Sequence, residues 1–355
     1  MAMRVGVVIT AFASSGSVVA LRSFTDGVLK ATGSVVSLLE GGVGVVAQSR
    51  GGFPLTLLGL HAAAVCQRAA YSSPRETGDK GPRCDCGEDA FFVGVPNPRT
   101  VSVGVADGVG GWRRRGIDSG AFAWELMQQC QEVADYSPPT SRWEILPWRR
   151  SATVSDPVTV LRKGFARVWA AVEPPPGSAT ACVAQLDRRS GELSVANLGD
   201  SGFVLLRADE VALESKAQQH RFNQPFQLSV FPNGTYGGVT PDQADLYTFK
   251  VMEGDLLILM TDGVRDNLPA TSIAEAVRLL PNREPDVVAR AVVEAALERS
   301  KSKLDSPFSV AARAAGFRYP SKGKEDDITV VVGRVEVSQT KRPAPFFLND
   351  HDHAM

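Results

Sequence analysis

The residues of this chain whose types and spacing could do chemistry are carboxylates at the ends of apolar, strand-like runs. Asp107 ends one such run and Asp262 ends another, and both are followed by Gly-Val. Further acids lie beside other runs or shortly after these two, namely Glu88, Asp89, Asp266, Asp326 and Asp327. A single Asp-Gly pair after a strand is most often a plain turn. Strand ends in one core can lie close together, however, so this set of carboxylates could converge.

Converging carboxylates favour a bound cation. Such groups repel one another, and burial raises their pKa values, unless a divalent ion balances their charge. Oxygen ligands with few histidines or cysteines point to Mg²⁺ or Mn²⁺ rather than zinc, and the chain has four histidines and five cysteines. Gly108 permits close backbone approach, so its carbonyl could be a further ligand. Two ions about 3.5–4 Å apart would lower the pKa of a bridging water and clamp a transferring phosphoryl group.

The elements that must position these residues follow from hydrophobic periodicity and turn residues. The patterns predict strands at 101–106, 180–186, 193–197, 202–206, 255–260 and 328–335, and helices at 119–133, 157–172, 273–280 and 286–297. This order lacks the regular strand-helix alternation of a doubly wound parallel sheet. It favours an α+β fold, with antiparallel sheets and helices packed outside them.

The first seventy or so residues differ in composition from the rest of the chain. Their only acids are Asp26 and Glu40, against five basic residues, as is typical of an organelle transit peptide. The apolar stretch at 5–21 is interrupted by serines and falls short of the roughly 20 apolar residues of a membrane span. We expect residues 1–75 to be a targeting or disordered extension, with no stable membrane span. A disordered extension without an address is the alternative. Residues 80–336 are expected to form the folded domain, and residues 338–355 a disordered tail.

The bulk numbers exclude some partners. The 355 residues carry a formal charge of −1, so nothing in the charge argues for nucleic acid or an anionic membrane surface. Hydrophobic residues make up 44% of the chain, enough for a sizeable core. The odd number of cysteines in a large chain favours reduced, structurally incidental thiols over a disulfide framework; these are Cys66, Cys84, Cys86, Cys130 and Cys182. The sequence leaves the oligomeric state open.

Six blocks in order carry a family resemblance. They are Glu88-Asp89, Val105-Ala106-Asp107-Gly108-Val109-Gly110-Gly111, Gly177-Ser178-Ala179-Thr180-Ala181, Asn197-Leu198-Gly199-Asp200-Ser201, Thr261-Asp262-Gly263 and Asp326-Asp327-Ile328. Together they resemble the metal-dependent type 2C protein phosphatases over roughly residues 80–335. The stretches 107–112 and 197–203 look like the T-cell activation protein phosphatase branch. That branch is mitochondrial in animals and fungi and includes chloroplast members in plants, so a mitochondrial location is expected, with chloroplast, another organelle or cytoplasm as alternatives.

The resemblance implies a central β-sandwich of two antiparallel sheets flanked by α-helices. It also implies hydrolysis of phosphoserine and phosphothreonine in phosphoproteins by a water bridging two Mn²⁺ or Mg²⁺ ions. Carried over by motif, Asp107 would bridge both ions, Asp262 and Asp326 would bind the first, and Glu88 and the Gly108 carbonyl would bind the second. The remaining implied roles are a metal-bound water held by Asp89 and a weaker, third metal position at Asp266.

The chain departs from the family pattern at two positions. Val109 stands where many members have a histidine proposed to protonate the leaving group, so that proton would come from a metal-bound water. Cys84 stands where many members have a phosphate-binding arginine; Arg83, one residue away, is the candidate for that role, and Arg113 is a second. Each could equally be a solvated surface arginine.

Three further positions have alternative interpretations. The family's Asp-Asn-hydrophobic pattern favours Asp326 over Asp327 as the ligand. Asp200, in Gly-Asp-Ser, is interpreted as a structural turn residue rather than a ligand. His220 could line a substrate groove or be a satisfied loop histidine.

Two other functions remain as alternatives to an active protein phosphatase. One is a catalytically weak, metal-binding scaffold for phosphoproteins, suggested by the missing histidine and the displaced arginine. The other is a metal-dependent hydrolase of a small phosphate ester. Phosphate release from a phosphopeptide distinguishes an active phosphatase from the scaffold, which would bind without release. Substrate profiling distinguishes a protein phosphatase from the hydrolase of a small phosphate ester.

Overall fold

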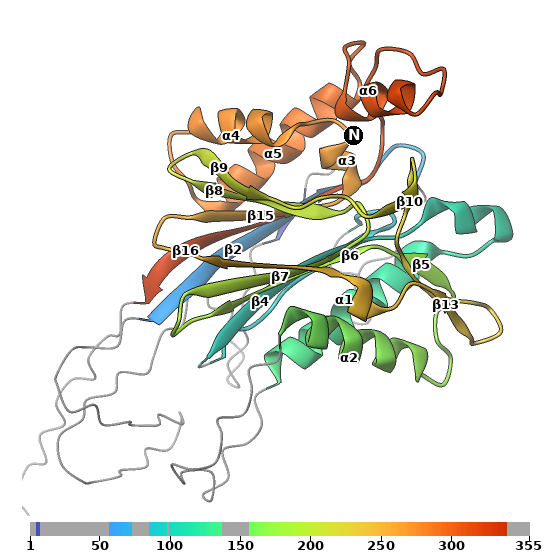
Figure 1. Ribbon diagram of the computed structural model, residues 1–355, viewed down its shortest axis with the longest axis horizontal. Helices are drawn as coiled ribbons and strands as arrows, with labels where there is room; N and C mark the ends of the chain where they lie inside the picture. The colour runs from blue at the N-terminus through green and yellow to red at the C-terminus, as the bar shows by residue number, and fades with distance from the viewer. Residues whose placement is uncertain (1–4, 8–56, 73–84, 98, 137–155, 339–355) are drawn as a thin grey trace, which may run out of the picture.

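The computed structural model describes residues 5–7, 57–72, 85–97, 99–136 and 156–338. Two antiparallel sheets pack face to face, and helices cover the outer face of each (Figure 1). The predicted α+β sandwich is therefore confirmed.

The first sheet has six antiparallel strands. Their order is β1 (Val5–Val7), β2 (Leu57–Gln67), β16 (Ile328–Ser338), β15 (Leu256–Met260), β8 (Gly202–Arg207) and β9 (Glu210–Glu214). The two strands that end or begin at predicted site residues, β15 and β16, are neighbours in its middle.

The second sheet has five antiparallel strands. Their order is β14 (Asp245–Lys250), β7 (Glu192–Leu198), β6 (Ala181–Asp187), β4 (Thr100–Asp107) and β3 (Asp89–Val93). In the register of β3 and β4, Asp89 stands opposite Asp107. Pairing of these strands therefore brings two of the predicted site carboxylates together.

The apolar runs of the sequence are strands buried on both faces. In β15, Leu257 and Leu259 belong to the core between the sheets, whereas Ile258 and Met260 belong to the core beneath the helices. Successive strand side chains point to opposite faces, so a strand covered on both sides must be apolar at every position. This explains why these strands read as continuous hydrophobic runs rather than as alternating ones.

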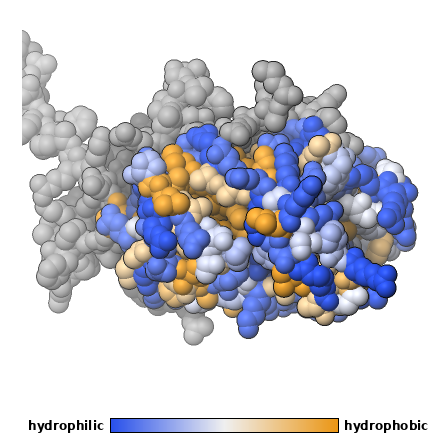
Figure 2. Space-filling model, turned by 90° about the horizontal axis from the view of Figure 1, so that it is seen from above, coloured by the Kyte–Doolittle hydropathy of each residue, from blue (hydrophilic) through white to orange (hydrophobic). Residues whose placement is uncertain are grey.

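Each sheet has its own pair of covering helices. α1 (Ser119–Asp135) and α2 (Pro157–Trp169) pack on the five-stranded sheet, and α4 (Ala270–Arg278) and α5 (Pro285–Ser300) pack on the six-stranded one. Asp118 caps α1 by accepting a hydrogen bond from the backbone of Gly120, as side-chain oxygens do at helix starts. On the face seen in Figure 2, which carries α4 and α5, apolar residues are interspersed with hydrophilic ones.

Smaller elements lie at the end of the sandwich where β4 and β15 end (Figure 1). They are η1 (Gly110–Arg115), β5 (Gly177–Ala179), β10 (Gln219–Arg221), β11 (Gln224–Pro225), β12 (Leu228–Val230), β13 (Tyr236–Gly238), η2 (Pro241–Gln243), α3 (Asp262–Arg265) and α6 (Pro307–Ala314). These elements frame the strand ends that carry the predicted site residues.

The expected start of the folded domain near residue 80 is wrong. Residues 57–67 were assigned to a disordered extension, but they form β2, which pairs with β16 from Leu57 to Gln67 and packs against α5. Val5–Val7 also pairs with β2. The partner strand of β2 lies at the far end of the chain, so no local pattern could reveal this pairing. Residues 68–72, which follow β2, are also described, whereas the remainder of the expected extension and the tail from 339 to 355 lie outside the described residues.

The expectation of reduced thiols is wrong for two cysteines. Cys66, at the end of β2, and Cys86, just before β3, form a disulfide. Cys130 and Cys182 are free and buried, and Cys84 lies outside the described residues. The disulfide ties the misassigned strand β2 to the loop that carries Glu88 and Asp89.

Within the described ranges, none of the helices is both long and apolar enough to cross a membrane.

Candidate active site

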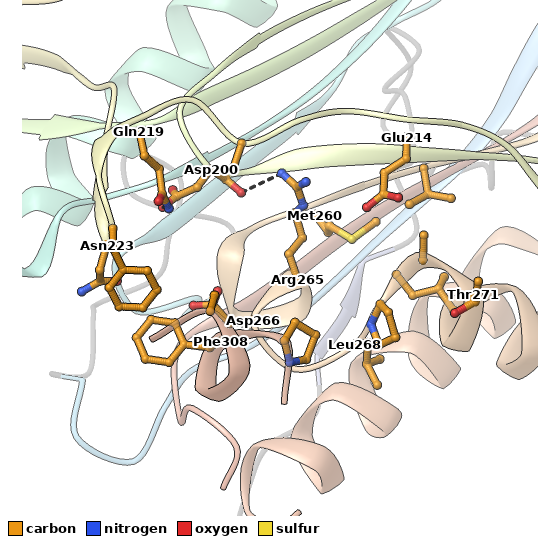
Figure 3. Close-up of a pocket in the computed structure, with 18 residues that line it drawn as sticks. Asp200, Glu214, Gln219, Asn223, Met260, Arg265, Asp266, Leu268, Thr271 and Phe308 are labelled. Carbon is orange, nitrogen blue, oxygen red and sulfur yellow. Dashed lines mark hydrogen bonds between the residues drawn. The ribbon is translucent and has the colours of Figure 1, made fainter. Parts of the chain in front are cut away.

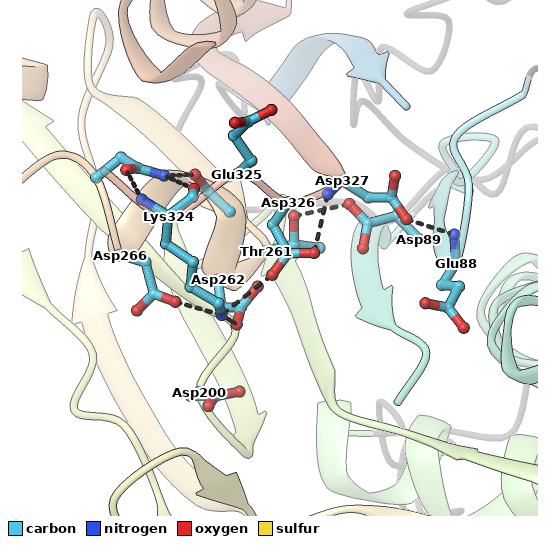
Figure 4. Close-up of polar contacts among 12 residues, drawn as sticks. Glu88, Asp89, Asp200, Thr261, Asp262, Asp266, Lys324, Glu325, Asp326 and Asp327 are labelled. Atoms are coloured by element: carbon cyan, nitrogen blue, oxygen red, sulfur yellow. Dashed lines mark hydrogen bonds and ion pairs between the residues drawn. The ribbon is translucent and has the colours of Figure 1, made fainter. Parts of the chain in front are cut away.

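Carboxylates from both sheets meet at one end of the sandwich (Figure 4). Asp89 begins β3 and Asp107 ends β4 in one sheet, while Asp262 follows β15 and Asp326 precedes β16 in the other. The pKa of Asp107 is raised by burial and by the neighbouring charges, of which Asp262 is the largest. The two sheets thus bring together carboxylates that are far apart in the sequence.

One group of three carboxylates in the centre includes Asp200, which the Gly-Asp-Ser turn motif predicts to be structural. Carboxylate oxygens of Asp107, Asp200 and Asp262 all lie within 4.8 Å of one another. Asp200 was interpreted as a structural turn residue, yet it is only 8% exposed. Its Oδ2 accepts a hydrogen bond of 3.0 Å from Gln219, and its Oδ1 is buried with no hydrogen-bond partner among the described residues. A buried acceptor without a donor is one that a cation would satisfy.

In both Asp-Gly pairs, the glycine lies against a neighbouring backbone carbonyl group, which leaves no room for a side chain. A side chain at Gly108 would meet the carbonyl oxygen of Glu88 at 2.7 Å, and one at Gly263 would overlap the carbonyl oxygen of Asp327. Glycine is required where another backbone approaches this closely. The backbone of Gly108 also donates to Glu88 O at 3.0 Å, which joins the end of β4 to the loop before β3.

Asp326 and Asp327 face different partners. Asp327 accepts hydrogen bonds from the backbone of Ala69 at 2.7 Å and of Glu88 at 2.9 Å, and from the Ser72 hydroxyl at 2.9 Å. Asp326 Oδ1 accepts hydrogen bonds from the Tyr71 hydroxyl at 2.6 Å and from the backbone of Asp327 at 3.0 Å, while its Oδ2 lies 3.1 Å from the Lys324 ammonium, which also contacts the cluster. Asp327 thus fastens two loops, and Asp326 is the one beside the centre, as the family pattern favours.

Glu88 lies at the side of the centre. Its Oε1 accepts a hydrogen bond of 2.7 Å from the hydroxyl of Ser119, and its Oε2 pairs with Arg113. Arg113 also lies 5.4 Å from the centroid of the Tyr71 ring. Arg83, the other arginine proposed to bind phosphate, lies outside the described residues.

One lysine, Lys324, stands among the acids and belongs to none of the six sequence motifs. Lys324 Nζ is 2.7 Å from Asp262 Oδ2 and 2.6 Å from Asp266 Oδ2. Burial alone would raise the pKa of Asp262, but the ion pair with Lys324 outweighs it and holds that pKa below its usual value. The signal was present in the sequence, because Lys324 lies two residues before Asp326.

Burial and mutual repulsion act on the remaining acids. They raise the pKa of Asp200 to about 6 and that of Asp266 to about 8, in each case with burial as the largest cause. The pKa of Asp89 is also raised, first by burial and then by the charge of Asp327. Neighbouring buried carboxylates disfavour one another's ionised form. A bound divalent cation would offset their negative charges and so stabilise the ionised form.

A pocket of about 460 Å³ adjoins the centre (Figure 3). Asp200 and Asp266 belong both to its wall and to the acidic cluster. Phe222 and Phe308 also line it and pack against each other with ring centroids 5.1 Å apart. His220, a candidate for a substrate groove, stacks on Phe226 at 4.4 Å between ring centroids and is exposed.

The fold and the centre define a class of protein: a β-sandwich flanked by helices, with a buried carboxylate centre at one end. Comparison with known proteins identifies the family. Residues 97–336 match the family model of stage II sporulation protein E. The chain is 39% identical over 261 residues to a Drosophila willistoni protein described as "Protein phosphatase PTC7 homolog fig", covering 71% of this chain and 78% of that one. A human protein described as "Protein phosphatase PTC7 homolog" is 38% identical over 256 residues, covering 70% and 79%.

Among solved structures, the photosystem II phosphatase PBCP superposes with a TM-score of 0.62 at 30% identity, covering 78% of this chain and 99% of that one. The phosphatase domain of SpoIIE from Bacillus subtilis superposes with a TM-score of 0.50 at 13% identity, which shows the fold alone. The chain belongs to the type 2C family of protein phosphatases. The resemblance seen in the motifs is thereby confirmed, and the protein is a hydrolase.

Proposed function

We propose that this phosphatase hydrolyses phosphoserine and phosphothreonine in proteins with two Mn²⁺ or Mg²⁺ ions at the carboxylate centre. The observation that carries the proposal is the approach of Asp107, Asp200 and Asp262 within 4.8 Å at the meeting point of the two sheets. A buried group of carboxylate oxygens is the ligand type that such hard cations prefer.

Two ions are proposed for this donor set. Asp107, Asp262 and Asp326 would hold one of them, and Glu88 with the carbonyl of Gly108 would hold the other, with Asp107 serving both. Asp200, which lies within 4.8 Å of Asp107 and Asp262 and whose Oδ1 has no hydrogen-bond partner among the described residues, would be a further donor. Ions bound there lower the pKa of a coordinated water and stabilise negative charge on the transferring phosphoryl group. The Ser119 hydroxyl, which already bonds Glu88, would fix the direction of that carboxylate.

Two positions beside the centre, Arg113 and Val109, bear on phosphate binding and on protonation of the leaving group. The Arg113 side chain forms an ion pair with Glu88 and is 38% exposed. Its guanidinium could therefore form hydrogen bonds with two oxygens of a bound phosphate group. Val109 offers no proton, so the side chain after Gly108 cannot protonate the departing serine or threonine oxygen.

The pocket beside the centre supports a polypeptide substrate. Because Asp200 and Asp266 line both the pocket and the centre, residues next to the phosphorylated one would lie over this pocket. A phosphopeptide should therefore be preferred to a small phosphate ester at equal concentration.

A mitochondrial location is proposed for the protein. Its support is the low acid content of the first seventy or so residues, where two acids stand against five basic residues. Cleavage of a targeting segment is expected before Leu57, because β2 belongs to the sandwich, and it would remove β1 and leave β2 as the edge strand of its sheet. Sequencing the N-terminus of the protein isolated from purified mitochondria tests both statements.

The central experiment is phosphate release from a phosphopeptide by the wild type and by Asp107→Asn. We expect turnover with Mn²⁺, none in excess chelator, and loss of turnover in Asp107→Asn. Phosphopeptide binding without release would instead identify a scaffold. Robust turnover in excess chelator would exclude the proposed metal chemistry.

A further inference from the structure

Lys324 places its ammonium among three carboxylates of the centre. Its Nζ lies 2.7 Å from Asp262 Oδ2 and 2.6 Å from Asp266 Oδ2, and Asp326 Oδ2 is 3.1 Å away (Figure 4). The side chain is 18% exposed. The ammonium is therefore enclosed by carboxylates that follow β15 and precede β16, which lie at the same end of this antiparallel pair.

The position of Lys324 is fixed by its backbone. Lys324 N donates to Asn267 Oδ1 at 3.0 Å, and Asn267 Nδ2 donates to Lys324 O at 2.8 Å. The same amide group donates to Gly263 O at 2.8 Å. Asn267 is buried and follows Asp266 directly, so the lysine is fastened to the turn that carries Asp262 and Asp266.

The ammonium has a further contact away from the acids. It lies 5.0 Å from the ring centroid of Phe308, a distance at which a cation is attracted to an aromatic face. A compact point charge with several donors is also the form of cation that can bond more than one carboxylate at once. Both the backbone and the ammonium group of Lys324 are thus held in the centre by specific contacts.

We propose that Lys324 is a positioning residue that takes the place of a metal ion between Asp262 and Asp266, and so limits the centre to two divalent ions. The proposal rests on the proposed function. A third ion would have to displace a tethered ammonium that already bonds both carboxylates. Asp266, which the motif resemblance assigned to a third metal, would then serve the lysine instead.

The test is the number of Mn²⁺ ions bound per chain, measured by titration calorimetry on the full metal-stripped chain. The wild type should bind two ions. Lys324→Met, which keeps the length and removes the charge, should bind three, and Lys324→Met with Asp266→Asn should return to two. Lys322→Met is the matched control, because Lys322 is exposed two residues away, and it should bind two.

Asp266→Asn alone provides a measurement that does not depend on the folding of Lys324→Met, and it should still bind two ions. A wild-type count other than two, a fall in the count of Asp266→Asn, or a folded Lys324→Met that binds two would each overturn the proposal. Phosphate release is recorded separately. Two bound ions without turnover would refute the proposed function and leave the role of Lys324 standing.

Discussion

At the scale of single residues, the centre depends on which carboxylate faces which partner. Asp326 and Asp327 are adjacent in the sequence, but one contacts the acidic cluster and the other accepts three hydrogen bonds from two loops. Their chemistry is the same and their surroundings differ, so substitution should separate a functional role from a structural one.

We expect Asp326→Ala to lower phosphopeptide turnover and Asp327→Ala to lower stability. Loss of Asp326 should cost at least the roughly 10–100-fold that removal of an outer-sphere partner costs. Loss of Asp327 leaves buried donors without an acceptor and should lower the free energy of unfolding by about 3 kcal/mol. Urea unfolding and steady-state kinetics measure the two effects. Equal loss of stability in both variants would contradict the assignment.

The metal-free protein should lose stability as the pH rises from about 5 to about 8. Burial and neighbouring charges raise the pKa of Asp200 to about 6 and that of Asp266 to about 8, from 3.8. A carboxyl with a raised pKa in the folded state adds stability while protonated, and this stability is lost as the pH passes through the folded pKa. Asp262 has a lowered pKa, so its contribution stays constant across this range.

Thermal unfolding in excess chelator across this pH range measures the trend. With Mn²⁺ present, the gain in melting temperature should grow with pH, because the metal competes with protons for the carboxylates. A melting temperature that rises with pH in chelator would contradict the raised pKa values.

At the scale of elements, close backbone approach fixes α3 against the start of β16 at the end of the six-stranded sheet. α3 begins at Asp262 and presses Gly263 against the carbonyl of Asp327, at the start of β16. The glycine of this Asp-Gly pair is therefore a packing requirement between two elements, and the aspartate before it is the group placed for chemistry.

We expect Gly263→Ala to lower the free energy of unfolding by about 2 kcal/mol or more, as overpacking of a rigid site does. The added methyl group would overlap the Asp327 carbonyl oxygen and push α3 from β16. Gly59→Ala in β2 is the control, because a Cβ there has nothing within 4 Å, and it should change stability little. Urea unfolding gives the free energy of unfolding of both variants. Similar losses in the two variants would contradict the steric overlap expected at Gly263.

At the scale of the whole molecule, the domain needs its N-terminal strand. β2 pairs with β16 along its whole length, from Leu57 to Gln67, and packs against α5. The disulfide from Cys66 to Cys86 then links this strand to the loop before Asp89. Removing β2 would expose both β16 and the underside of α5.

A chain that starts at Leu57 should fold and bind Mn²⁺, whereas one that starts at residue 75 should not fold. The first retains β2 and the second loses it, together with the Cys66 half of the disulfide. Circular dichroism and melting temperature measure the outcome. A cooperative unfolding transition in the shorter chain would show that β2 is dispensable.

The sequence by itself determined the family, the α+β class and most strands and helices. Apolar runs mark strands because both sheet faces are buried, and the motifs near Asp107, Asp262 and Asp326 are local in sequence. Residue chemistry also determined that the centre would be built of carboxylates.

Only the tertiary structure decided what depends on pairing between distant segments. β2 was assigned wrongly because its partner, β16, lies more than 260 residues later in register, as in the pair Leu57 and Ser338. Cys66 and Cys86 meet because that pairing places β2 beside β3. Asp200 and Lys324 enter the centre for the same reason: a turn residue and a surface-type cation become site residues only when two sheets bring their ends together.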